Sequence, residues 1–137
     1  MLDLDNTLVH SVKNRIKSRK EDILVKIDLN SKSSYSIYCY KRPGVDQFLK
    51  TLAENFEIII FTASLGIYAN QVMRQLDPNR VCQTILNRTH CTVHEGLYTK
   101  DMRLMNRNMK DIIIVDNCPS AYMLTPEVAL PIKTWLA

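Results

Sequence analysis

The sequence lacks the features of a membrane protein or a secreted protein. No apolar run approaches the roughly 18 residues of a membrane-spanning helix, and the N-terminus has neither the basic nor the apolar region of a signal peptide. The four cysteines are widely spaced and include no CxxC pair, which favours free thiols in a reducing compartment. We therefore expect an intracellular protein, nuclear or cytoplasmic, with no membrane contact.

Internal repeats and low-complexity linkers are also missing, which favours a single domain over residues 1–137. A chain of 137 residues should bury roughly two thirds of its unfolded surface, which is enough for one core. Its apolar share of 46% is typical of a soluble globular protein. A monomer is expected.

Outside one short segment, the chain has almost no excess charge. The net charge is +4, yet residues 13–20 ("KNRIKSRK") alone hold five basic side chains. Of the 18 basic residues 13 therefore lie elsewhere, against 14 acidic residues in the whole chain. The segment is typical of a solvated loop; a steering patch for an anionic partner and a nuclear-localisation-like signal are the functional alternatives. We expect no direct binding of nucleic acid.

Two strands and two helices are predicted in the first 80 residues. Alternating apolar residues at 23–29 and an aromatic, β-branched run at 35–40 predict strands, and the polar residues between them predict a hairpin. Apolar side chains at helical spacing predict helices over 45–52 and 68–76. Pro43 is well placed for the first turn of the earlier helix.

Continuous apolar runs predict the strands of a buried parallel sheet. They lie at 56–61 and 111–116, and 128–132 is a possible further strand. Strands that alternate with helices indicate an α/β fold with a mostly parallel sheet. Ligands bind at the carboxyl ends of the strands in such sheets, so the residues after each run belong together. These residues are Asp3, Asp5, Thr7, Thr62, Ala63, Ser64, Asp116 and Asn117.

This set of side chains suits phosphate chemistry with a metal ion. Acidic groups in one crevice repel each other unless a cation neutralises them, and oxygen ligands suit Mg²⁺. Small hydroxyl groups at a strand end suit a phosphate. A carboxylate beside both can attack phosphorus, and a second one two residues later can move the protons. The candidate ligands are Asp3, the Asp5 backbone carbonyl, and Asp116 or Asn117.

Five motifs resemble those of one enzyme family. "DLDNT" matches the DxDxT signature of haloacid-dehalogenase-like phosphatases. The segments "DLDNTLVHS", "YKRPGVDQFL", "FTASLGIYA", "YTKDM" and "IIIVDNCPSAY" are similar to phosphatases of the RNA polymerase II C-terminal domain, and most of all to their small members. The resemblance extends from Asp3 to Trp135. It implies a Rossmannoid, mostly parallel sheet flanked by helices, with a small β-hairpin flap at about 11–41 and no large cap.

The resemblance implies a catalytic role for four residues. Asp3 matches the nucleophile that becomes phosphorylated. Asp5 matches the general acid and base, and its backbone carbonyl also reaches the metal. Thr62 matches a phosphate-binding hydroxyl, and Lys100 matches the lysine that pairs with the nucleophile and the transferring phosphate. The implied Mg²⁺ ligands are Asp3, Asp5, Asp116 and Asn117, with Asn117 expected as the direct ligand of the last two.

The implied substrate is phosphoserine or phosphothreonine in a protein segment, such as the RNA polymerase II C-terminal repeat. The flap is too small to form a lid, so the site should stay open, as a protein segment requires. Thr7 matches a residue that steadies the motif loop, four apolar or aromatic residues match a pocket for a proline, and a basic residue lies near the peptide. The implied substrate-binding residues are Thr7, Ser64, Val25, Ile27, Leu65, Tyr68 and Arg88.

Two alternatives remain beside the phosphoprotein phosphatase. A non-catalytic peptide-binding module of the same fold should have degraded motifs, whereas the catalytic residues are all present here. A small-molecule phosphatase of the superfamily is disfavoured because no insert is large enough to form a lid.

Two departures from the family pattern lead to further expectations. Lys13 stands where close relatives carry an aromatic residue of the proline pocket, so we expect a weaker pocket. Only Met1 and Leu2 precede Asp3, so we predict a short first strand that weakens this edge of the sheet.

Overall fold

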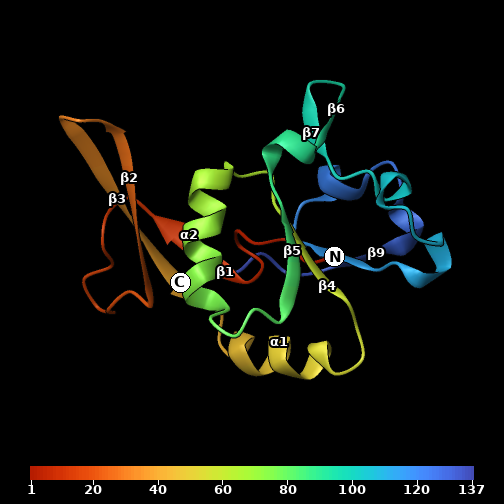
Figure 1. Ribbon diagram of the computed structural model, residues 1–137, viewed down its shortest axis with the longest axis horizontal. Coiled ribbons are helices and arrows are strands. Elements are labelled where there is room, and N and C mark those ends of the chain that lie inside the picture. The colour runs from red at the N-terminus through yellow and green to blue at the C-terminus, as the bar shows by residue number, and fades with distance from the viewer.

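The computed structural model describes all 137 residues and has a small parallel sheet at its centre (Figure 1). Strand β4 (Ile58–Phe61) pairs in parallel with β5 (Cys82–Leu86), and β8 (Ile114–Asp116) pairs in parallel with β9 (Ala129–Pro131). Leu2 joins the two pairs, since it forms parallel bridges to Ile60 and to Val115. The parallel order is therefore β5, β4, the segment around Leu2, β8 and β9.

The segment around Leu2 is short, as the sequence predicts, but it does not lie at an edge. The Leu2 N–H donates to the Ile59 carbonyl, and the Phe61 N–H donates to the Leu2 carbonyl. On the other side the Val115 N–H donates to the Met1 carbonyl, and the Asp3 N–H donates to the Val115 carbonyl. Both neighbours hold this segment in the middle of the sheet, so it is not an edge strand, and its expected weakness stays a prediction.

Alternate residues of the central strands face two separate apolar clusters. Ile58 and Ile60 belong to the larger cluster, together with residues from both helices and from the flap. Phe61 points to the other face, where it packs with Met102 and Ile114. Side chains on successive strand residues point to opposite faces, so these apolar runs are covered on both sides, as predicted.

Both predicted helices are present. Helix α1 (Val45–Ala53) begins after Gly44, so Pro43 lies just before the helix and not in its first turn. Helix α2 (Gly66–Leu76) ends at Asp77, where the sequence "DPN" stops it. Their buried faces include Val45 and Leu49 of α1, and Tyr68, Ala69, Val72, Met73 and Leu76 of α2. Phe48 of α1 shares the helical spacing of Val45 and Leu49 but is 39% exposed.

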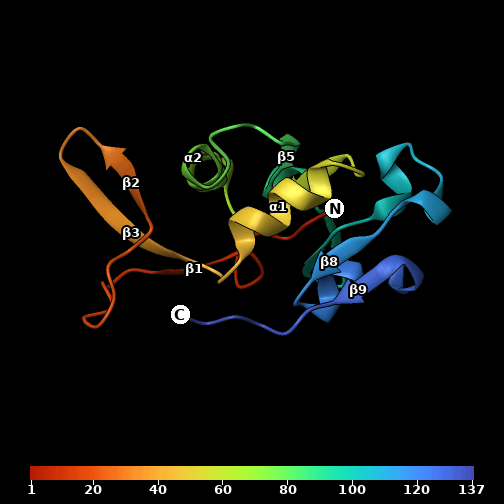
Figure 2. The same ribbon diagram turned by 90° about the horizontal axis from the view of Figure 1, so that it is seen from below.

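The predicted hairpin forms the flap. Strand β2 (Ile23–Asn30) pairs antiparallel with β3 (Ser33–Lys41), and β3 pairs in turn with β1 (Val9–Val12). Figures 1 and 2 both show the hairpin projecting away from the parallel sheet on the side of α2. The Gln71 and Gln75 side chains of α2 donate to carbonyl oxygens of β2, which fixes the flap to the helix.

The remaining segments are short and were mostly not predicted. A second hairpin, β6 (Thr92–His94) with β7 (Leu97–Thr99), follows β5. Single turns of 3₁₀-helix lie at 88–90, 102–105, 109–111, 119–122 and 126–128. The turn at 109–111 shortens the strand expected at 111–116, because the Asn108 side chain accepts from the Lys110 N–H and starts the turn. None of the helices combines the length and the apolar character needed to cross a membrane.

Candidate active site

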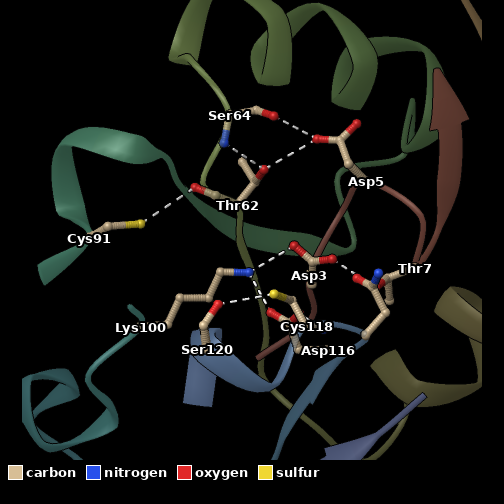
Figure 3. A network of polar contacts seen from close by, with 11 residues as sticks. Asp3, Asp5, Thr7, Thr62, Ser64, Cys91, Lys100, Asp116, Cys118 and Ser120 are labelled. Atoms are coloured by element: carbon tan, nitrogen blue, oxygen red, sulfur yellow. Dashed lines mark hydrogen bonds and ion pairs between the residues drawn. The ribbon is translucent and has the colours of Figure 1, made fainter. Parts of the chain in front are cut away.

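Four separate segments bring polar side chains to the carboxyl edge of the parallel sheet, three of them expected from the strand ends and the fourth from the family resemblance. One follows Leu2, one follows β4, one follows β7, and one ends β8. Figure 3 shows the side chains turned toward one another from these segments. The buried members are Asp3, Thr7, Thr62, Lys100 and Asp116, while Asp5, Ser64 and Asn117 are partly exposed.

Lys100 is the centre of the first group. Its ammonium nitrogen lies 2.7 Å from Asp3 Oδ1 and 2.6 Å from Asp116 Oδ2. Lys100 is only 2% exposed, and its own N–H donates to the Ala121 carbonyl. Hydrogen bonds between charged partners in a buried site are strong and well oriented. Lys100 therefore fixes the carboxylate of Asp3 from one side.

Thr7 fixes the same carboxylate from the other side. Its hydroxyl donates to Asp3 Oδ2 at 2.7 Å and lies 3.2 Å from Asn117 Oδ1. The amide nitrogen of Asn117 donates to the Thr134 hydroxyl, which orients the Asn117 oxygen toward Thr7. Lys100 thus holds Oδ1 of Asp3, and Thr7 holds Oδ2. The Asn117 oxygen contacts the same Thr7 hydroxyl.

Asp5 is the centre of the second group. The Ser64 hydroxyl donates to Asp5 Oδ2 at 2.7 Å, and the Thr62 hydroxyl lies 3.4 Å from the same oxygen. The Tyr68 hydroxyl donates to the other oxygen, Oδ1, at 2.5 Å. Hydroxyl groups from the β4–α2 link therefore occupy one oxygen of Asp5, and a hydroxyl from α2 itself occupies the other.

Burial shifts pKa values in both groups. Burial raises the pKa of Asp5, and hydrogen bonds from Tyr68 and Ser64 oppose this only in part. Burial, and then the charge of Asp3, raise the pKa of Asp116. Burial alone would lower the pKa of Lys100, but the charges of Asp3 and Asp116 outweigh burial and raise it. Lys100 is therefore a cation at neutral pH, while Asp5 keeps its proton to a higher pH than an exposed aspartate.

The oxygens at this edge fit a hard divalent cation. Two carboxylates, Asp3 and Asp116, share the one ammonium group of Lys100, which leaves excess negative charge. No three His, Cys, Asp or Glu side chains converge as a metal-binding group, so an ion here needs amide and backbone oxygens as well. The Asn117 amide oxygen and the Asp5 backbone carbonyl, which accepts no hydrogen bond from the chain, can supply them. This mixed oxygen set is the type that Mg²⁺ prefers.

The residues implied for substrate binding are more dispersed. Val25 and Ile27 are 0% and 5% exposed and lie inside the main core, so neither forms part of an open pocket. Leu65, in contrast, is exposed at the start of α2. Arg88 is exposed, donates to the Ala63 carbonyl at 2.7 Å and lies over the Tyr98 ring. The proline pocket therefore remains a prediction.

The structure gives Tyr68 a polar contact that sequence reasoning missed. Its ring is buried, as the helical spacing predicts, but its hydroxyl contacts Asp5 and lies 2.5 Å from Ser11 Oγ. Burial, and then the charge of Asp5, raise the pKa of Tyr68, so it is a donor at any physiological pH. Ser11, on β1, ends the motif "DLDNTLVHS", but sequence reasoning gave it no role, because its contact with Tyr68 depends on the packing of β1 beside α2.

Comparison with known proteins identifies the family. The family described as "NLI interacting factor-like phosphatase" matches residues 1–137. The chain belongs to this family. This confirms the family resemblance seen in the sequence.

Curated relatives are similar over almost the whole chain. A "Probable C-terminal domain small phosphatase" of Dictyostelium discoideum is 44% identical over 135 residues, which cover 98% of this chain and 43% of the relative. The human "Carboxy-terminal domain RNA polymerase II polypeptide A small phosphatase 2" is 39% identical over 98% of this chain and 49% of its own length. The chain thus spans less than half the length of these relatives.

A solved structure supports the fold. The fission yeast RNA polymerase II CTD phosphatase Fcp1, bound to beryllium fluoride, matches this structure with a TM-score of 0.78 at 18% identity. The match covers 98% of this chain and 40% of the Fcp1 chain. At this identity the match shows the fold alone, which is the haloacid-dehalogenase-like fold expected from the motifs.

Proposed function

We propose that this chain is a Mg²⁺-dependent phosphoprotein phosphatase that acts through a phosphorylated Asp3. The observation that carries the proposal is the placement of Asp3, whose two oxygens are held by Lys100 and Thr7, with the protonatable carboxyl of Asp5 two residues away. Family membership and the match over the whole chain support the same activity.

The chain's own residues divide the work of the reaction. One oxygen of Asp3 attacks the phosphorus of a phosphoserine, and the bond from phosphorus to the serine oxygen breaks. Asp5, in its protonated form, gives its proton to the leaving serine oxygen. Asp5 then takes a proton from a water molecule, which attacks the phosphorus and frees inorganic phosphate from Asp3. Lys100 balances the negative charge of the phosphoryl group during both steps.

The Mg²⁺ site would be formed by Asp3, the Asp5 backbone carbonyl, Asn117 and Asp116. When bound, the ion would neutralise the repulsion between the carboxylates and the incoming phosphate. Asp116 reaches Lys100 with one oxygen and accepts from the Cys118 N–H with the other, which suits an orienting role. Asn117 has the freer oxygen, which favours it as the direct ligand.

A protein segment is the substrate class that the fold favours. The β2–β3 flap packs against α2 instead of closing over the catalytic edge. An open edge admits a phosphoserine held in a chain. The names of the relatives point to the C-terminal domain of RNA polymerase II as a candidate source of that segment.

A panel of phosphate esters tests this function. Purified protein should release phosphate from phosphoserine heptad peptides and from p-nitrophenyl phosphate with Mg²⁺, and chelation should abolish release. Asp3→Asn should lower both rates by at least about a thousandfold, since loss of a nucleophile removes the covalent route. Full activity in Asp3→Asn would exclude the mechanism.

The same panel separates the two alternatives. Turnover of small metabolite esters in preference to every phosphopeptide would assign a small-molecule phosphatase. Tight binding of phosphopeptides by the wild-type protein, without turnover of any ester, would assign a non-catalytic binding module.

A further inference from the structure

The loop between β1 and β2, residues 13–22, carries most of the net charge of the chain. It holds five of the 18 basic residues and two of the 14 acidic residues, so 13 basic and 12 acidic residues lie elsewhere. We call it the basic loop. The rest of the chain is thus nearly neutral, and the proposed catalytic residues are all outside the loop.

The two arginines of the basic loop build its structure. Arg15 pairs with Glu21 at 2.6 Å and lies over the Tyr38 ring. Arg19 pairs with Asp22 at 2.9 Å and lies over the rings of Tyr40 and Trp135. Each acidic residue of the loop is therefore used by an arginine. The backbone is also tied down, because the Ile16 N–H donates to the Tyr40 hydroxyl and the Asp22 N–H to the Cys39 carbonyl.

The three lysines of the basic loop are left without partners. Lys13, Lys17 and Lys20 are exposed, and none of their ammonium groups forms a hydrogen bond or an ion pair. An arginine suits a planar structural contact with a ring and a carboxylate, whereas a lysine is a mobile point charge. The excess positive charge of the loop is therefore presented to solvent from an ordered backbone.

Both ends of the basic loop lie close to the catalytic segment. Ser11 touches the Tyr68 hydroxyl that holds Asp5, and Lys13 follows Ser11 by two residues, or roughly 7 Å of strand. At the other end, Arg19 lies over the Trp135 ring. The backbone N–H of Trp135 donates to the Asn6 carbonyl. Figures 1 and 2 both show the loop beside the C-terminal end of the chain, in agreement with these contacts.

We propose that Lys13, Lys17 and Lys20 form a second anionic subsite, which selects phosphoprotein segments carrying acidic residues or a second phosphate beside the scissile phosphoserine. The proposal rests on the proposed phosphatase function and names its substrate class. The scissile phosphate itself is placed at the catalytic edge, so the lysines attract negative charges further along the peptide.

The span of an extended peptide fits this arrangement. Each extended residue advances about 3.3 Å, so side chains about three to six positions from the phosphoserine lie roughly 10–20 Å from it. Exposed ion pairs are individually weak, and salt screens them. Three lysines acting together should therefore give about a five- to tenfold preference in kcat/KM, which decreases at high ionic strength.

Four peptides with one common phosphoserine test the subsite. One is neutral, one carries glutamates before the phosphoserine, one carries them after it, and one has a second phosphoserine. We expect wild-type kcat/KM to be about five- to tenfold higher for at least one charged peptide than for the neutral one. The triple variant Lys13→Gln, Lys17→Gln, Lys20→Gln should lose this ratio. A matched variant that loses three exposed charges elsewhere, Lys50→Gln, Arg74→Gln and Lys110→Gln, should keep it.

Equal kcat/KM for all four peptides, or a charge preference that survives in the loop variant, would overturn the proposal. Failure of the phosphatase function is a distinct result, because then the wild-type protein hydrolyses none of the peptides. Binding of fluorescent peptides to Asp3→Asn still tests the subsite in that case, with the same expected ratio and the same loop dependence. Equal binding of an oligonucleotide would overturn the assignment to acidic peptides.

Discussion

At the scale of single residues, the site depends on hydroxyl groups that hold two carboxylates. Asp3 is held by a lysine and a threonine, whereas Asp5 is held by hydroxyl groups alone. An ammonium partner places a positive charge 2.7 Å from one oxygen of Asp3. Hydroxyl partners in a buried setting allow Asp5 to be protonated or ionised. Two aspartates two residues apart can thus take different roles because their neighbours differ.

Tyr68→Phe tests whether the tyrosine positions Asp5 for proton transfer. The variant keeps the buried ring and loses the hydroxyl that donates to Asp5. We expect kcat on phosphoserine peptides to decrease by about tenfold, the worth of one oriented hydrogen bond. Hydrolysis of p-nitrophenyl phosphate should decrease much less, because its leaving group needs little help from an acid. Equal decreases for both esters would show that the hydroxyl serves stability instead.

The cysteines should differ in reactivity because only the thiolate is alkylated. Burial, and then the charge of Asp77, raise the pKa of Cys82 to about 12, and burial raises the pKa of Cys39 and Cys91. Raising these values reduces the thiolate fraction at pH 8, to about one part in ten thousand for Cys82. Iodoacetamide at pH 8 should therefore modify the exposed Cys118 first, as read by mass spectrometry. Fast labelling of Cys82 in the folded protein would contradict this.

Residue identity alone predicted some of these arrangements and not others. The aspartates of the site were found because they follow apolar runs that end at one edge of the sheet, and Lys100 was found through the resemblance of "YTKDM" to a family motif. Ser11 and the hydroxyl of Tyr68 were not found, because their contacts depend on how β1 crosses α2. The same holds for Val25 and Ile27, whose burial depends on how the flap packs against that helix.

At the scale of elements, short connections hold the catalytic segments in place. Asp77, 8% exposed, joins the end of α2 to the start of β5, because its two carboxylate oxygens accept from the N–H groups of Val81 and Cys82 at 3.0 and 2.8 Å. Helix α2 also carries Tyr68, so this link fixes the helix that orients Asp5.

Asp77→Ala should lower the free energy of unfolding by about 2–4 kcal/mol, since it leaves two N–H groups without acceptors. Urea denaturation measures the change. The control is Asp46→Ala, which removes an exposed carboxylate paired with Lys41 and should change stability by less than about 1 kcal/mol. Equal changes in the two variants would show that the link at Asp77 adds nothing.

The strongest periodic patterns predicted the elements best. Helices α1 and α2, the β2–β3 hairpin and β4 all lie close to the predicted ranges, because each has a full apolar face or a continuous apolar run. Strand β5 was missed because polar Gln83 and Thr84 interrupt its apolar residues, and the β6–β7 hairpin was missed because each of its strands has only 3 residues. Strand pairing, which no local pattern contains, stabilises these segments.

At the scale of the whole molecule, the parallel order brings residues more than 100 positions apart into one site. Thr7 and Asn117 are 3.2 Å apart because the segment around Leu2 lies beside β8. This convergence also brings buried carboxylates close together, where their negative charges repel each other. Binding of a divalent cation should therefore stabilise the entire fold.

Mg²⁺ should raise the melting temperature of the wild-type protein by about 5–10 °C at a concentration one hundredfold above its dissociation constant. Asn117→Ala removes one expected ligand and should reduce this shift at the same Mg²⁺ concentration. Differential scanning fluorimetry with and without a chelator measures both. The same shift in the variant and the wild-type protein would place the ion elsewhere.

The most direct test of the central claim is chemical trapping of Asp3 during turnover. Borohydride reduces an aspartyl-phosphate to homoserine, which peptide mass spectrometry locates at a single residue. We expect homoserine at position 3 when the wild-type protein is mixed with a phosphoserine peptide and Mg²⁺, and none when either is left out. Rapid phosphate release with Asp3 unmodified, or with homoserine at another aspartate, would exclude Asp3 as the nucleophile.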